Sequence, residues 1–429
     1  MPIVIIGMLD EREPALRIIK DQIERRDHAT ILVDISIGTG GIVPMLEADV
    51  SPAEIARLGG GTIDEVTQLI DTGRERAISI MVNGLTAKIS ELYRMGEMEG
   101  VIAVAGMTGT SISLTTMSTL PFGLPKLLIS SVVAMPAYAN RLAQYLGLKD
   151  IVVMNSVVDM VGMNLPVHTV AINGANAIAG MVETTTHFPD ESRNSIVITE
   201  FNFCDEGAHY VRKVLSEKYD VVSFHAQGIG DRAAVDFVRQ KRCRGFIDLV
   251  PASYGEYLLG GNRASGPRRL NIANDLLIPY IISPCGFDMI SCGPIERKDK
   301  DDRLWKSRKL TERKLFFQDA MRVQARTTAE EMQQIARAVA ERLNLYRDKK
   351  MVKFVIPTRG FSSLSVEGGA LYDPDSDAAF VSTLKEHLDS GIKVFEVDTH
   401  INSHEFAATV AEALTEAFQA IPNVEAANG

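Results

Sequence analysis

The 429-residue chain carries several short runs in which glycine stands beside hydroxyl, acidic or imidazole side chains. The first is Ala105-Gly106-Met107-Thr108-Gly109-Thr110-Ser111, directly after the apolar run 101–104. Two glycines let the backbone approach an anion closely, and the hydroxyl groups can donate to it at the start of a helix. Because no lysine follows, the run is not a Walker A loop. It is compatible with phosphate binding and also with a capped structural turn.

The second run is Gly228-Ile229-Gly230-Asp231-Arg232-Ala233. With Asp248 near the end of the apolar run 245–250, it matches the G-x-G-x-x-G/A dinucleotide fingerprint, which has an acid about 20 residues further on. His225, just before the run, is a candidate acid–base group or a hydrogen-bonded strand end. Two interpretations stay open here, a dinucleotide site and a glycine loop that binds anions in general.

Acidic and imidazole side chains follow two later apolar runs. Ser283-Pro284-Cys285-Gly286-Phe287-Asp288-Met289 presents Asp288, whereas Cys285 has the character of a buried thiol. Asp398-Thr399-His400-Ile401-Asn402 places a carboxylate, an imidazole and an amide within one short loop. Asp288 and Asp398 are therefore candidate metal ligands, and Asp288 and His400 join His225 as candidate catalytic groups. Local bracing of the loop is the alternative for the last of these runs.

Two arginines stand where anions are commonly bound. Arg326 and Thr327 precede the helix start Thr328-x-x-Glu331, and Arg359 and Gly360 follow an apolar run. An arginine beside a helix N-terminus makes a good clamp for a phosphate or a carboxylate. The alternative is that Thr328 only caps the helix, while Arg326 and the nearby Arg322 pair with surface acids.

The elements that must position these residues alternate between apolar runs and helical patterns, which is typical of α/β proteins with parallel sheets. Residues 3–6 form a fully apolar strand, and Asp10 is the expected N-cap of the helix that follows. The same rhythm returns near residue 195, and Asn402-x-x-Glu405 is expected to open the last helix. We therefore predict two Rossmann-like domains with mainly parallel sheets, residues 1–190 and 191–429, with a cleft between them. Ligands are expected beyond the carboxyl ends of the strands.

Composition narrows the range of partners. The chain has 45 Lys and Arg against 55 Asp and Glu, a net charge of −10, so it offers no overall basic field for a nucleic-acid backbone. The most apolar stretch, residues 124–139, is interrupted by lysine, serine and proline, so no membrane span is expected. Its four cysteines lack the C-x-x-C spacing, and the N-terminus lacks the pattern of a signal peptide. These features predict a cytoplasmic protein.

Eight blocks in a fixed order resemble one family, the Tm-one-like ATP-binding domain proteins, which are otherwise uncharacterised. The blocks are Ile6-Gly7-x-x-Asp10, Gly109-Thr110-Ser111 with Leu120-Pro121-x-Gly123-x-Pro125-Lys126, Ser156-Val157-Val158-Asp159-x-x-Gly162-x-Asn164, Phe224-His225-Ala226-x-Gly228-x-Gly230, Ser283-Pro284-x-Gly286-x-Asp288-Met289, Arg326-Thr327-Thr328-x-Glu330-Glu331, Pro357-x-Arg359-Gly360, and His400-Ile401-Asn402 with Glu405-Phe406-Ala407. The resemblance implies a two-domain α/β protein that binds ATP and is often a homodimer. It also implies, as a partner, a protein with a phosphoenolpyruvate-mutase-like TIM barrel.

The first loop departs from the family's usual pattern. It reads Gly7-Met8-Leu9-Asp10-Glu11-Arg12, where the family commonly has G-T-x-D-T-K. Glu11 places a carboxylate where the family commonly has a hydroxyl, and it repels phosphate unless a metal bridges the two, so Mg²⁺ is a candidate cofactor beside ATP. The residues expected to bind the nucleotide come from loops of both domains: Gly7, Asp10, Gly106, Thr108, Gly109, Thr110, Ser111, Gly228, Gly230, Arg326, Thr327, Arg359 and Gly360.

The preferred hypothesis is an ATP-binding metabolic enzyme that acts on a small phosphorylated or carboxylated metabolite. A non-catalytic binding protein regulated by its nucleotide is the alternative from another class. An NAD(P)-dependent oxidoreductase, built on the Gly228 run, is the third hypothesis.

Overall fold

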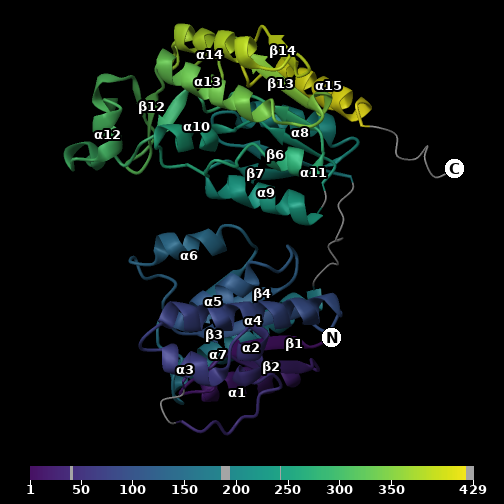
Figure 1. The fold of residues 1–429 in the computed structure, drawn as a ribbon, viewed down its shortest axis with the longest axis vertical. Coiled ribbons are helices and arrows are strands. Elements are labelled where there is room, and N and C mark those ends of the chain that lie inside the picture. The colour runs from purple at the N-terminus through teal and green to yellow at the C-terminus, as the bar shows by residue number, and fades with distance from the viewer. Residues whose placement is uncertain (39–41, 185–193, 242, 422–429) are drawn as a thin grey trace, which may run out of the picture. The chain divides into compact units, whose positions relative to one another are not determined.

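The computed structural model describes residues 1–38, 42–184, 194–241 and 243–421, in two compact units, Met1–Phe188 and Pro189–Gly429. Each unit is a parallel sheet with helices on both faces, so the expected α/β fold class is confirmed (Figure 1). The predicted boundary between residues 190 and 191 falls in 185–193, outside the described residues.

The N-terminal unit has one five-stranded sheet in the order β2-β1-β3-β4-β5, with every neighbouring pair parallel. Its strands are β1 (Ile3–Gly7), β2 (Thr30–Asp34), β3 (Gly100–Ala105), β4 (Lys126–Ser130) and β5 (Val152–Asn155). β1, β3 and β4 are buried along their whole length, which explains why their sequences are almost continuously apolar. The strand order reverses between β1 and β3, which is where open α/β sheets bind ligands.

Helices cover both faces of this sheet. One face packs against α1 (Glu13–Glu24) and α7 (Leu165–Thr184). The other packs against α2 (Pro52–Leu58), α3 (Ile63–Leu69), α4 (Arg74–Arg94), α5 (Met107–Met117) and α6 (Ala139–Leu146). The expectation that Asp10 caps α1 is wrong, because the helix begins at Glu13 with Arg12 in the N-cap position. Asp10 instead accepts a hydrogen bond from the Arg12 backbone N–H at 3.0 Å.

The C-terminal unit has a six-stranded parallel sheet in the order β14-β13-β9-β8-β6-β7. Its strands are β6 (Ser195–Glu200), β7 (Asp220–His225), β8 (Gly245–Asp248), β9 (Tyr280–Ile282), β13 (Val352–Pro357) and β14 (Lys393–Val397). A separate antiparallel sheet joins β10 (Met289–Ser291), β12 (Val323–Arg326) and β11 (Leu315–Phe317). In both large sheets, the strand that comes first in the sequence lies between the second and the third: β1 between β2 and β3, and β6 between β7 and β8.

Helices again pack on both faces of the larger sheet. α8 (Asp205–Leu215) and α15 (His404–Gln419) share one core, whereas α9 (Ile229–Lys241), α10 (Ala252–Leu259), α11 (Ile272–Leu276), α12 (Arg303–Ser307), α13 (Ala329–Leu343) and α14 (Pro374–His387) contribute to the other. The capping box predicted for α13 is confirmed, with Thr328 and Glu331 each bonding the other's backbone. The helix start predicted at Asn402 is corrected by one residue, because Ser403 caps α15.

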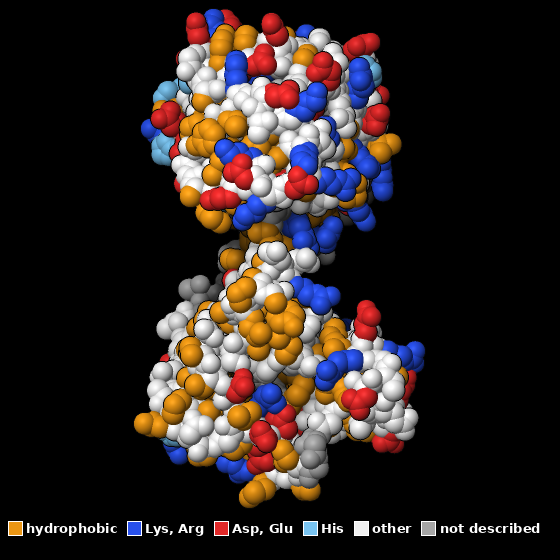
Figure 2. Space-filling view, turned by 90° about the vertical axis from the view of Figure 1, so that its left-hand side faces the viewer, with side chains coloured by type: hydrophobic (Ala, Val, Ile, Leu, Met, Phe, Trp, Pro, Cys, Tyr) orange, Lys and Arg blue, Asp and Glu red, His pale blue; other side chains and the backbone are white. Residues whose placement is uncertain are grey.

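The surface of the N-terminal unit carries exposed apolar side chains, and Figure 2 shows apolar side chains gathered on one of its faces. Val157, Leu165 and Met163 are among these exposed side chains, at 80%, 77% and 61%. Exposed apolar surface is typical of protein contacts, so the homodimer stays a prediction. No helix among the described residues is both long enough and apolar enough to cross a bilayer.

Candidate functional site

The loops after β1 and β3 meet at the point where the strand order of the N-terminal sheet reverses. Gly7 is the last residue of β1, and Gly106 is the N-cap of α5. Glycine has no side chain that could cap the helix, and no side chain of the described residues forms a capping hydrogen bond there. Because the first backbone N–H groups of a helix have no partner within it, they give this edge of the sheet a positive potential.

Arg12 adds a full positive charge at the same place. A Cβ atom placed on Gly106 would lie 2.7 Å from a terminal guanidinium nitrogen of Arg12, so the absence of a side chain at Gly106 makes room for this cation. Asp10 holds the guanidinium through an ion pair. The sequence had singled out Gly106 and Asp10 separately, and the structure brings them together through Arg12.

The hydroxyl groups of the glycine–threonine run differ in how they are used. Thr110 is 1% exposed, and its hydroxyl is hydrogen-bonded to that of Ser130 at 2.7 Å, joining α5 to β4. Thr108 and Ser111 are half-buried, and neither hydroxyl is hydrogen-bonded to another of the described residues. Thr108 and Ser111 are therefore better placed than Thr110 to donate to a ligand.

A second carboxylate, Asp34, lies at the same edge and was missed as a site residue. It ends β2 and accepts hydrogen bonds from the Ser36 hydroxyl at 2.6 Å and from the Leu9 backbone N–H at 3.2 Å. Burial raises the pKa of Asp34, and the neighbouring Asp10 carboxylate raises it further. Asp10 and Asp34 are thus two acids close enough to interact beside one guanidinium. Asp34 could have been identified from the sequence, because it stands at the end of a predicted strand.

In the C-terminal unit, the Gly228–Gly230 run follows β7, the second strand, whereas the dinucleotide fingerprint follows the first. Gly228 has φ +83°, and a Cβ atom there would lie 2.7 Å from the Arg263 carbonyl oxygen. On Gly230 a Cβ atom would meet the His225 carbonyl oxygen at 1.9 Å. Both glycines are therefore required for close backbone packing.

The acid of that fingerprint is enclosed in an ion-pair cluster. Asp248 is completely buried and accepts hydrogen bonds from Arg269, from the Thr199 hydroxyl at 2.6 Å and from the Tyr280 hydroxyl at 2.6 Å. Asp231 binds the other side of the Arg269 guanidinium at 2.7 Å. With its oxygens used in this way, Asp248 has no capacity left for a ribose. These contacts argue against the dinucleotide hypothesis.

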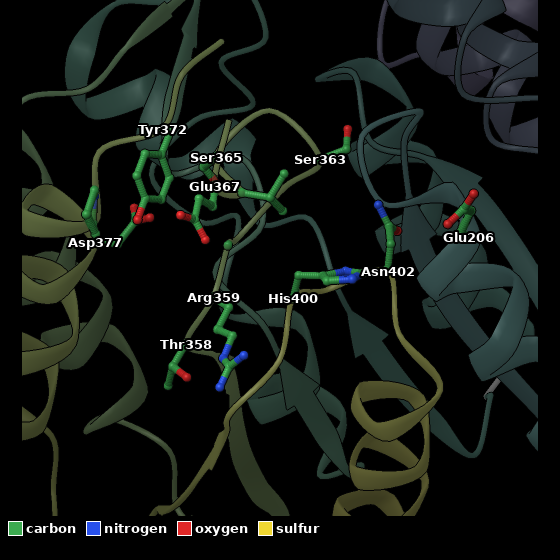
Figure 3. A pocket seen from close by; sticks show the side chains of 13 residues that line it. Glu206, Thr358, Arg359, Ser363, Ser365, Glu367, Tyr372, Asp377, His400 and Asn402 are labelled. Carbon is green, nitrogen blue, oxygen red and sulfur yellow. The ribbon is translucent and has the colours of Figure 1, made fainter. Parts of the chain in front are cut away.

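A cavity in the C-terminal unit lies beyond the carboxyl ends of β13 and β14 and has a volume of about 580 Å³ (Figure 3). Its lining comes from four segments: the start of α8, the loop after β13, the start of α14 and the loop after β14. The lining residues are Glu206, Thr358, Arg359, Gly360, Ser363, Ser365, Val366, Glu367, Tyr372, Pro374, Asp377, His400 and Asn402. The predicted residues Arg359, Gly360 and His400 therefore share one cavity, whereas His225, Gly228 and Gly230 lie at the opposite edge of the sheet.

Several lining residues are already engaged with the protein. Arg359 forms a two-pronged ion pair with Asp398, at 2.7 and 2.6 Å, and this pairing raises the pKa of Arg359 and lowers that of Asp398. Asn402 accepts a hydrogen bond from the Gly207 N–H at 2.9 Å and so completes the first turn of α8. These residues shape the cavity.

Asp377, in the wall of the cavity, is held from behind by Arg326, which does not itself line the cavity. This guanidinium donates to the backbone carbonyls of Asp288 and Asp373, both at 2.9 Å, and to the Asp377 carboxylate at 2.6 Å. Burial raises the pKa of Asp377 to about 7, despite the opposing effect of Arg326. No sequence signal distinguished Asp377 from the other acids at the start of α14.

The remaining predicted residues are held inside this wall. Thr327 donates its hydroxyl to the Phe287 carbonyl at 2.9 Å, and Asp288, fully buried, accepts from the Ser362 hydroxyl and from the Gly286 N–H. Asp398, by contrast, has a 76% exposed side chain. Among the described residues, no three His, Cys, Asp or Glu side chains are grouped to hold a metal ion. Cys285 is fully buried and its pKa is raised, as expected for an unreactive thiol.

Comparison with known sequences assigns the chain to a family. The models of the N-terminal and C-terminal domains of the uncharacterised protein family UPF0261 match residues 1–187 and 193–418. The chain belongs to this family. A UPF0261 protein of Clostridium tetani is 31% identical over 96% of this chain and 98% of the relative. A UPF0261 protein of Brucella suis is 28% identical over 95% of this chain and 93% of the relative.

Two tomato proteins are also similar to this chain. The tomato ToMV resistance protein Tm-1 is 28% identical over 80% of this chain and 45% of the tomato protein. The tomato ToMV susceptible protein tm-1 is likewise 28% identical, over 83% of this chain and 46% of the tomato protein. The resemblance to the Tm-one-like family, drawn from the eight blocks, is therefore confirmed.

Proposed function

We propose that this UPF0261 protein binds the phosphates of a magnesium-bound nucleotide, with ATP as the first candidate, at the carboxyl edge of β1 and β3. The observation that carries the proposal is the Arg12 guanidinium against Gly106, at the uncapped N-terminus of α5. A cation beside free backbone N–H groups is the arrangement that binds phosphate. The resemblance to the ATP-binding domain family supports the same ligand class.

The two carboxylates at this edge fit the metal. Mg²⁺ is usually held by one or two carboxylates together with the phosphates of the substrate. Asp10 and Asp34 lie close enough for the charge of one to raise the pKa of the other. A divalent cation between them and the phosphates turns this repulsion into attraction, and it meets the need for a bridging metal that the acidic first loop creates.

Calorimetric titration with ATP, with and without Mg²⁺, tests the proposal. Replacing Arg12 by glutamine is expected to weaken ATP binding about tenfold to a hundredfold, because a charge-assisted contact contributes roughly 1.5–3 kcal/mol. Arg17→Gln is the matched control, since Arg17 lies on α1 and pairs with Glu13. Equal affinity of the wild type and Arg12→Gln, or no ATP binding at all, would contradict the proposal. Saturable NADH binding in place of ATP would favour the oxidoreductase hypothesis.

A further inference from the structure

The cavity of the C-terminal unit lies outside the proposed nucleotide site, and its lining is rich in negative charge. Glu206, Glu367 and Asp377 contribute carboxylates, whereas the single guanidinium, Arg359, is already paired with Asp398 at the rim. The charge of Glu367 adds to the field that raises the pKa of Arg359. Asp377 is paired with Arg326, but Glu206 and Glu367 have no such partner among the described residues, so a phosphate or carboxylate ligand would meet their negative charges.

The wall around Asp377 contains the cation Arg326 and two further acids, Asp288 and Asp373, whose charges act on Asp377. Arg326 forms ion pairs with Asp377 and, at 3.9 Å, with Asp373, and it also donates to the backbone carbonyl of Asp288. Its Nε atom is buried without a hydrogen-bond partner among the described residues. Asp377 is 7% exposed, and only its Oδ1 atom accepts a hydrogen bond from a described residue, Arg326. Its Oδ2 atom is thus an unpartnered acceptor in the wall of the cavity.

Other polar groups in the lining are also without internal partners. No hydrogen bond between described residues uses the side-chain polar groups of Glu206, Ser363, Glu367, Tyr372 or His400. Figure 3 shows Glu367, Asp377 and the Tyr372 ring together at one side of the cavity, with Glu206 on the opposite side. Glu206, Ser363, Glu367 and His400 are exposed, so water can satisfy their polar groups. Asp377 is buried, and a buried carboxylate oxygen without an internal partner at a cavity is the feature that indicates a ligand.

We propose that this cavity binds a small organic ammonium compound, whose charged group is held by Asp377 and Glu367 beside the ring of Tyr372. Carboxylates next to an aromatic ring provide both ion pairing and cation–π attraction. The volume of about 580 Å³ fits a small organic molecule rather than a bare metal ion. An added positive charge also stabilises the ionised form of Asp377, whose pKa burial raises to about 7. The ligand class differs from the anionic metabolite expected from sequence, and the inference does not depend on nucleotide binding.

The test is calorimetric titration of the full chain with n-butylammonium and 1,4-diaminobutane. Neutral 1,4-butanediol, succinate, inorganic phosphate and Mg²⁺ are titrated in parallel. The two ammonium probes are expected to bind and the other four are not. Asp377→Asn and Glu367→Gln should each weaken ammonium binding about tenfold, the effect of losing one charge-assisted contact. Asp375→Asn, an exposed acid in the same helical turn, is the matched control and should leave the affinity unchanged.

Each result of these titrations either supports or overturns the proposed ammonium binding. Absence of ammonium binding, or binding of succinate, phosphate, Mg²⁺ or the diol as tightly as the ammonium probes, would overturn the inference. So would an equal loss in Asp375→Asn and Glu367→Gln. If Asp377→Asn fails to fold because Arg326 loses its partner, Glu367→Gln decides the question, since Glu367 is exposed and makes no hydrogen bond with a described residue. The Arg12 variants report on the nucleotide proposal alone.

Discussion

Two arginine–aspartate clusters lie in the C-terminal unit, and they differ in how completely their charges are satisfied. Around Arg269, Asp231 and Asp248 accept hydrogen bonds on all of their carboxylate oxygens, from Arg269, Ser253, Thr199, Tyr280 and the Gly228 backbone. Around Arg326, two atoms have no hydrogen-bond partner among the described residues: Nε of Arg326 itself and Oδ2 of Asp377. Asp377 lines the cavity. A buried ion cluster that is complete supports the fold, whereas one left incomplete beside a cavity is ready to accept a ligand.

The largest expected effect follows from opening the complete cluster. Replacing Arg269 by methionine leaves Asp231 and Asp248 buried without their cation, so the free energy of unfolding should fall by about 3–5 kcal/mol. Arg268→Met is the control, because the Arg268 side chain is 78% exposed. Urea unfolding monitored by circular dichroism measures both. A loss below about 1 kcal/mol in Arg269→Met would mean that this cluster is not the stabilising one.

A smaller, pH-dependent effect is expected at the incomplete cluster. The pKa of Asp377 is raised to about 7 by burial and by Asp288 and Asp373, against the opposing charge of Arg326. Between its ordinary pKa and pH 7 the native state therefore holds a proton that the unfolded chain has lost, so this group makes the wild type less stable as the pH rises. Asparagine cannot ionise. The stability of Asp377→Asn relative to the wild type should rise by about 2–3 kcal/mol between pH 5 and pH 8.

That comparison is made by urea unfolding of both proteins across the pH range. Taking the difference between variant and wild type cancels the titration of other groups with raised pKa values, including Asp34 and Asp231. A difference that stays constant with pH would show that Asp377 is ionised throughout.

The smallest effect on stability is expected at the rim of the cavity. Arg359 and Asp398 have side chains that are 66% and 76% exposed, so Asp398→Asn should leave urea unfolding unchanged. The freed guanidinium should nevertheless weaken n-butylammonium binding a few-fold, and this loss should shrink as salt is added. Unchanged ammonium affinity at low salt would show that the rim charge does not reach the ligand.

The sequence predicted several of the strands and one helix start, because fully apolar runs such as residues 3–6 and the Thr328–Glu331 capping box are local signals. It did not predict which charges meet. Arg326 was expected to clamp an anion, yet it holds Asp377, 51 residues further on. That contact depends on how β12 and α14 pack, which no local pattern encodes. The Gly228 run shows the converse, since its spacing is local but its role as close packing is set by distant Arg263.

The cavity is closed by segments that are far apart in the sequence, and this affects the order in which parts of the chain can fold during synthesis. The first turn of α8 is completed by Asn402, which is synthesised 195 residues after Gly207. The Phe203 carbonyl likewise accepts a hydrogen bond, at 2.9 Å, from the Ser363 N–H, which is synthesised much later. A nascent chain therefore carries an unfinished helix start and an open-sided cavity until the loop after β14 leaves the ribosome. The sheet of the N-terminal unit has all its strands once residue 155 is made. During translation, the proposed nucleotide site can thus become functional well before the cavity does.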